Sequence, residues 1–169
     1  MRYRAAGREV TLDPASPLLH FDENKLPIHG VPWALLEWNV LGKSRDRVTA
    51  ELSWDRDDLL AVFPFQHTMR MSAALHAGAL AIDTTLHASG EESVPVCFGF
   101  HPYFGIPKSP RAQWRIILPA MRRLVPDERG IPTGEMRPFD AQDQSLGDRT
   151  FDDGFALDGD HATFSIAGG

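Results

Sequence analysis

The chain has 169 residues, 43% of them hydrophobic and 24% charged, a composition typical of one soluble globular domain rather than a disordered or membrane-spanning chain. Its 17 basic and 23 acidic residues are interspersed and give a formal net charge of -6, which argues against a nucleic-acid partner and against an anionic membrane surface. A single cysteine, Cys97, excludes an internal disulfide and a cysteine-rich zinc site, and the N-terminus has no apolar signal segment, so we expect a cytoplasmic protein.

Alternation of apolar and polar residues with a period of two dominates the chain and predicts strands. The chain starts with the strand-like sequence RYRAAGREVTL, and turn sequences such as LGKSRDR, DRDD, ASGEES and DERGIPTG separate later segments. Strands are expected at residues 33–41, 48–54, 59–65, 69–75, 80–86, 94–100, 114–118 and 162–166. No segment has a capped helical stripe over three turns. We therefore predict a single all-β, mostly antiparallel domain over residues 1–169, built as a sandwich or barrel.

The two most regular strands predict a hairpin. With Gly78–Ala79 at the centre of a type II′ turn, Leu75 lies opposite Ile82 and Met71 lies opposite Leu86. This register places the apolar faces of the two strands together, and a slip of one residue would destroy the match.

The sequence CFGFHPYFGIP, residues 97–107, surrounds one histidine with aromatic rings. In a strand, Phe98 and Phe100 point to the core face, while His101 points to the other face, where Gly99 leaves space beside it. Tyr103 follows with a ring and a hydroxyl, so the cluster suits a polar ligand with apolar faces, such as a sugar. An alternative is that Gly99 marks a bulge and His101 is a structural hydrogen-bonding residue.

Two further stretches carry candidate residues. In LPIHGVPW, His29 precedes Gly30, which fits either a turn or a site. In RTFDDGFAL, Asp152 and Asp153 form a carboxylate pair before Gly154, which also fits a solvated turn. A cupin-type metal site needs a His-x-His pair with a glutamate shortly after it, and the chain has no such pair, so no metal site is expected.

Taken in order, these stretches resemble the aldose 1-epimerase (galactose mutarotase-like) family. The matching sequences are LPIHG, VPVCFGFHPYF and TFDDGFAL, with the stretch from Leu59 to Phe65 and the hairpin between them. GFHPYF is the most specific of these, and the order and spacing of the others strengthen the match. The resemblance covers nearly the whole chain and corresponds to the central portion of a family member.

The resemblance implies a β-supersandwich, incomplete in this chain, and interconversion of sugar anomers by general acid–base ring opening without a cofactor. It implies that His101 is the catalytic acid that protonates the ring oxygen, a role that suits histidine because imidazole titrates near neutral pH. It also implies that His29 and Asp152 bind the sugar, beside Tyr103.

Two participants that the family uses have no counterpart in this chain. The family's catalytic glutamate follows the third motif at a distance, and a sugar-binding arginine precedes the His-Gly pair. We therefore expect the chain to be a fragment of a larger mutarotase-like domain, and its own activity is in question without the glutamate. The alternatives are a non-catalytic carbohydrate-binding β-sandwich and a structural interaction module.

The resemblance also indicates which sugar the chain would bind and whether it would associate with itself. Relatives that act on hexose 6-phosphates often carry an arginine three residues after the His-Gly pair, and Trp33 at this position favours an unphosphorylated aldohexose. The open edges and apolar surface of an incomplete sandwich predict self-association.

Overall fold

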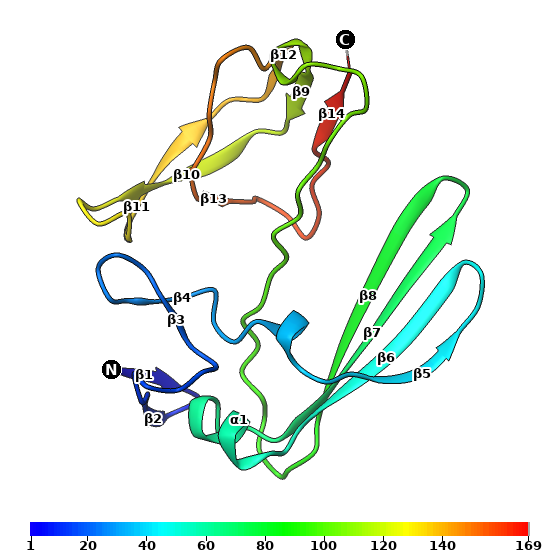
Figure 1. The fold of residues 1–169 in the computed structure, drawn as a ribbon. Coiled ribbons are helices and arrows are strands. Elements are labelled where there is room, and N and C mark those ends of the chain that lie inside the picture. Colours follow the sequence, from blue (N-terminus) through cyan, green and yellow to red (C-terminus); the bar gives the residue numbers. More distant parts are fainter. Residues whose placement is uncertain (169) are drawn as a thin grey trace. The chain divides into compact units, whose positions relative to one another are not determined.

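The structure, a computed structural model, describes residues 1–168, and its regular secondary structure consists mostly of antiparallel strands (Figure 1). The strands are β1 (Arg2–Ala5), β2 (Arg8–Thr11), β3 (His20–Phe21), β4 (Pro27–Ile28), β5 (Asn39–Lys43), β6 (Arg47–Trp54), β7 (His67–His76), β8 (Ala79–Ala88), β9 (Arg115–Leu118), β10 (Met121–Pro126), β11 (Pro132–Phe139), β12 (Gln142–Ser145), β13 (Phe155–Ala156) and β14 (Ser165–Ala167). Short helical segments are η1 (Trp33–Leu35), α1 (Asp57–Val62) and η2 (Arg111–Gln113). The all-β, antiparallel, sandwich-like fold that the sequence predicts is confirmed.

The chain divides into two compact units, Met1–Gly99 and the part that starts at Phe100. Each unit has buried apolar residues of its own. The single domain expected over residues 1–169 stays a prediction. No helix among the described residues has the length and apolar character needed to span a membrane.

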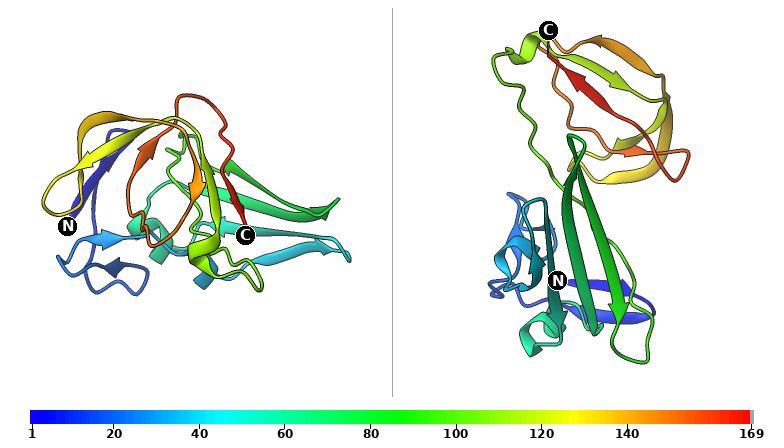
Figure 2. Two further views of the ribbon diagram at one scale, coloured as in Figure 1. Left: turned by 90° about the horizontal axis from the view of Figure 1, so that it is seen from above. Right: turned by 90° about the vertical axis from the view of Figure 1, so that its right-hand side faces the viewer.

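The first unit is organised by a four-stranded sheet in the order β5-β6-β7-β8, whose long β7–β8 hairpin is coloured green in both views of Figure 2. Leu52, Trp54 and Met69 lie on one face of this sheet and are 5%, 3% and 1% exposed. Leu59 of α1 and Val10 of β2 join the same cluster. This cluster is the core of the unit and is the main source of its stability.

Polar atoms in this core have partners. The Trp54 indole N–H donates to the Phe63 carbonyl oxygen over 2.9 Å, and the Tyr3 hydroxyl donates to the Val62 carbonyl oxygen over 2.6 Å. His67 is 4% exposed, stacks on Trp54, and its Nδ1 lies 2.7 Å from the Phe65 carbonyl oxygen. Burial raises the pKa of the Tyr3 hydroxyl above its usual value. The burial of His67, its stacking on Trp54 and its contact with the Phe65 carbonyl oxygen make it a structural residue of the core.

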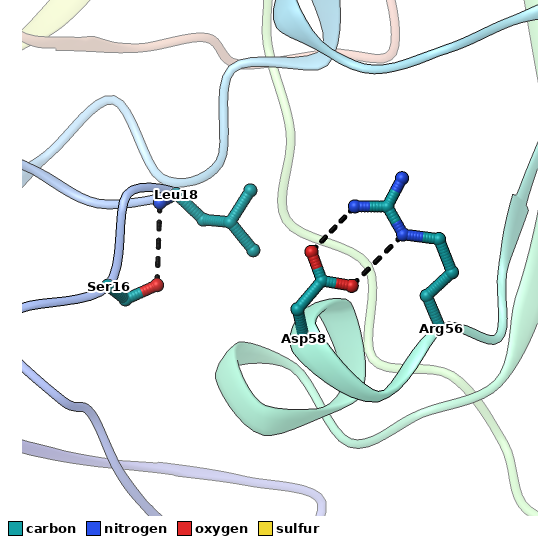
Figure 3. Close-up of polar contacts among 4 residues, drawn as sticks. All are labelled: Ser16, Leu18, Arg56 and Asp58. Atoms are coloured by element: carbon teal, nitrogen blue, oxygen red, sulfur yellow. Dashed lines mark hydrogen bonds and ion pairs between the residues drawn. The ribbon is translucent and has the colours of Figure 1, made fainter.

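Residues 57–62 form a helix, so the strand predicted at residues 59–65 is wrong. Leu59 and Val62 lie three residues apart and are both buried, a spacing that brings two side chains to one helical face. The carboxylates of Asp57 and Asp58 lie in the first turn, where the helix dipole favours negative charge. The Arg56 guanidinium donates to both carboxylate oxygens of Asp58 and lowers the pKa of that carboxyl (Figure 3).

The predicted β7–β8 hairpin is present. Its turn centre lies one residue before the predicted position, and the cross-strand partner of each residue differs from the predicted partner by two residues. The central turn residues are Ala77 and Gly78, with φ of 48° and 81°, which is the type I′ pattern rather than type II′. Leu75 consequently lies opposite Leu80, and Met71 lies opposite Thr84. Because the shift is two residues, each side chain keeps its predicted face.

The remaining strand predictions are of mixed accuracy. Strands at 48–54 and 114–118 are confirmed as β6 and β9. Residues 33–41 contain η1 before β5 starts, and residues 162–166 overlap β14 only at their end. Strands β10, β11 and β12 were not predicted, although DERG does form the turn between β10 and β11.

The second unit contains two three-stranded sheets, β11-β10-β13 and β12-β9-β14. Ile116, Met121 and Leu146 are its buried apolar residues, at 5%, 4% and 6% exposure. The pairing of β13 with β10 places Phe155 opposite Arg123 and fixes the position of the TFDDGFAL sequence.

Candidate functional site

The segment that contains His101 is irregular. Residues 93–106 form no strand, so the strand predicted at residues 94–100 is wrong. Phe98 and Phe100 are 41% and 54% exposed, so their predicted place in the core is also wrong. The physical reason is that this segment passes from one unit into the other and pairs with no strand among the described residues. Alternation in the sequence is therefore not sufficient to place a side chain in the core.

His101 and Tyr103 nevertheless lie together. Their ring centroids are 5.0 Å apart with an interplanar angle of 36°, and the Tyr103 side chain is 90% exposed. Aromatic rings attract one another when they are tilted or offset at this distance. The pair therefore presents an imidazole and an exposed phenol at one place on the second unit.

The TFDDGFAL sequence is fixed to β10 by several contacts. Two nitrogens of the Arg123 guanidinium donate to Asp153 Oδ1, the Nε at 2.9 Å, and the Leu124 N–H donates to the Gly154 carbonyl oxygen over 2.8 Å. A Cβ atom on Gly154 would lie 3.0 Å from Leu124 Cδ1, so the chain approaches β10 more closely than a larger residue allows without displacement. Phe155 packs edge-on against Phe139.

These contacts separate the two adjacent carboxylates. Asp153 is engaged by Arg123 and its side chain is 22% exposed. Asp152 is exposed, and its carboxylate makes no hydrogen bond or ion pair with the described residues. Of the pair, Asp152 is therefore the carboxylate that remains available to a ligand.

Replacing Arg123 with alanine is expected to loosen the segment around Asp152, because Asp153 then loses its cationic partner. The loss of stability should be about 1 kcal/mol, since the Arg123 side chain is 53% exposed and ion pairs near the surface contribute little. Backbone amide exchange at residues 152–154 should rise, as measured by hydrogen-exchange NMR. The exchanged pair, Arg123→Asp with Asp153→Arg, should restore protection. Equal exchange rates in the parent and the alanine variant would show that the ion pair does not hold this segment.

His29 lies in the first unit, directly after β4. His29 and Gly30 both have positive φ, 60° and 56°. A non-glycine residue in this left-handed region is uncommon, although histidine is enriched there, and such conformations occur at binding sites as well as in turns. His29 is exposed. Its conformation fits the turn and the site interpretations alike.

Of the predicted site residues, His101 and Tyr103 are in ring contact. Asp152 lies in the same unit as this pair, and His29 lies in the other unit. Sequence reasoning did not identify Arg123 as the partner of Asp153, because the two are 30 residues apart and no local pattern connects them.

A cavity of about 380 Å³ in the first unit contains none of the predicted site residues. Arg8 lines this cavity, and its side chain already has partners. Its guanidinium donates to the Pro64 carbonyl oxygen and to Glu92, and it lies 5.5 Å from the centroid of the Phe65 ring. These contacts indicate that Arg8 has a structural role in the first unit.

Comparison with known proteins gives one match. The family model described as aldose 1-epimerase matches residues 2–167. Searches of curated proteins and of solved structures gave no match.

Proposed function

Because the chain belongs to the aldose 1-epimerase family, we propose that it interconverts the anomers of an unphosphorylated aldohexose, with His101 as the catalytic acid. The single observation that carries the proposal is the family match over residues 2–167, which includes the GFHPYF sequence around His101. The exposed pair of His101 and Tyr103 supports it, because a sugar has access to both side chains.

The proposed reaction is a reversible ring opening. The His101 imidazolium donates its proton to the ring oxygen, the bond between that oxygen and C1 breaks, and the anomeric hydroxyl loses its proton to a water molecule, since no residue of this chain is proposed as the base. The product is the open-chain aldehyde. Rotation about the C1–C2 bond, followed by the reverse proton transfers, closes the ring with the opposite configuration. Imidazole suits this cycle because it can give and regain a proton near neutral pH.

The other residues are proposed to bind the sugar. The Tyr103 ring offers an apolar face to the C–H groups of a pyranose, and its hydroxyl offers a hydrogen-bonding group. Asp152 is proposed to accept hydrogen bonds from sugar hydroxyls, which its exposure permits and which the engagement of Asp153 by Arg123 favours. His29 is proposed to bind the sugar through its imidazole.

Titration of the isotope-labelled chain with D-glucose tests the binding part of this proposal. We expect amide shifts at His101, Tyr103, Asp152 and His29, and smaller shifts in an Asp152→Ala variant, because a carboxylate that binds hydroxyls has been removed. Myo-inositol is the matched control, since it has ring hydroxyls but neither a ring oxygen nor an anomeric carbon. Identical shifts with glucose and myo-inositol, or no shifts at the highest glucose concentration, would contradict the proposal that these four residues bind the sugar. Binding without faster anomer exchange would favour the non-catalytic carbohydrate-binding alternative.

A further inference from the structure

The sheet β5-β6-β7-β8 has two outer strands whose free edges differ (Figure 1). β5 has five residues, its pairing with β6 shifts register between Val40 and Gly42, and it ends at Lys43. Short edge strands, bulges and lysine are the usual means by which natural sheets prevent the addition of a further strand. The β5 edge is protected in all three ways.

The β8 edge has none of these protections. β8 has ten residues without proline, lysine or arginine, and it pairs with β7 at all ten positions with no register shift. Leu80 and Ile82 are 61% and 46% exposed. No strand among the described residues pairs with the outer side of β8. A long, regular and partly apolar free edge is a template for another strand.

We infer that this edge pairs antiparallel with the β8 edge of a second copy of the chain. The argument for a second copy is complementarity within β8 itself, between a carboxylate that accepts hydrogen bonds and an imidazole N–H that donates one. Its only ionisable side chains are Asp83 and His87, which lie four residues apart on one face and are both exposed. In a two-fold symmetric pair, Asp83 of each copy approaches His87 of the other, so the favourable contact forms twice.

Two registers give this contact. With Thr85 on the two-fold axis, Asp83 lies directly opposite His87 of the second copy, and the two threonines face each other. With Thr84 on the axis, Asp83 is the diagonal neighbour of both His87 and Asp83 of the second copy, and Ile82 lies opposite Leu86. A carboxylate beside an imidazole N–H, and paired threonines, both allow cross-strand hydrogen bonds. A register with Asp83 on the axis places two carboxylates opposite each other and is disfavoured.

Sedimentation of the whole chain over a hundredfold range of concentration tests the association. The mass should rise from 18.8 kDa towards twice that value. Ile82→Lys should weaken dimerisation by about tenfold or more, because it adds an unpaired positive charge at the edge. Leu41→Lys on β5 is the matched control, since Leu41 is 47% exposed and Ile82 is 46% exposed. It should leave dimerisation unchanged.

Cysteine cross-linking tests the strand pairing even if the Ile82 variant fails to fold. In a Cys97→Ser background, Thr85→Cys should form an intermolecular disulfide if Thr85 lies on the axis, and Thr84→Cys should do so if Thr84 does. A disulfide in either variant, absent from an Ala77→Cys control in the turn, supports the pairing and identifies its register. A monomer at every concentration would overturn the inference. So would a dimer that Leu41→Lys weakens and Ile82→Lys does not, or the absence of cross-links in both variants.

Discussion

Alanine at position 101 is expected to slow protein-catalysed exchange of sugar anomers by about 10²–10⁴-fold, the usual contribution of a positioned general acid. The alanine side chain has no proton to give to the ring oxygen, so ring opening reverts to solvent catalysis. His101 is exposed, so its replacement should change the free energy of unfolding by no more than about 0.5 kcal/mol. Magnetisation-exchange NMR between the α and β anomeric protons of D-glucose measures the rate after subtraction of the buffer rate.

His161→Ala is the matched control for this experiment. His161 is also an exposed histidine of the second unit, and no sugar-related role is proposed for it. Its replacement should leave the exchange rate unchanged. If His101→Ala exchanges anomers as fast as the parent, His101 is not the acid.

Leu59→Ala is expected to lower the free energy of unfolding of the first unit by about 2–5 kcal/mol. Leu59 is 1% exposed and belongs to the cluster formed with Leu52, Trp54 and Met69. Its truncation removes apolar contacts and leaves a cavity that a packed sheet and helix can close only in part. Urea denaturation, followed by tryptophan fluorescence, measures the change.

Leu35→Ala provides the control, because Leu35 is 71% exposed and the chemical change is the same. Its effect should remain within about 0.5 kcal/mol. Comparable losses in the two variants would contradict the placement of the core.

The period of two was sufficient to predict the fold class and the β7–β8 hairpin. The alternation from Met69 to Leu75 and from Leu80 to Leu86 is regular, and both strands are present. The register could not be predicted, because Ala77 occupies a turn position with φ of 48° that asparagine, aspartate or glycine usually fills. Sequence preference favours Gly78–Ala79 at the turn centre, whereas the chain uses Ala77 and Gly78.

Two other segments show where alternation misleads. Leu59 to Phe65 is apolar enough for a strand, and a helix of six residues is too short to show a 3.6-residue period. Val94 to Phe100 alternates clearly but belongs to none of the sheets among the described residues. Strand formation requires a partner for the backbone, and a single sequence does not contain that information for distant segments.

The candidate site was predictable only as far as local motifs extend. The proximity of His101 and Tyr103 follows from two residues of sequence separation, and their rings are in contact. The ion pair that engages Asp153 depends on Arg123, which belongs to a strand that the sequence did not predict. Long-range ion pairs of this kind lack a sequence signature.

Whether this chain opens and recloses an aldose ring is tested most directly by polarimetry of freshly dissolved α-D-glucose with the wild-type chain. We predict that the optical rotation reaches its normal final value faster than in buffer, at a rate that rises in proportion to the protein concentration. A rate equal to that of buffer at every protein concentration would contradict the proposed function.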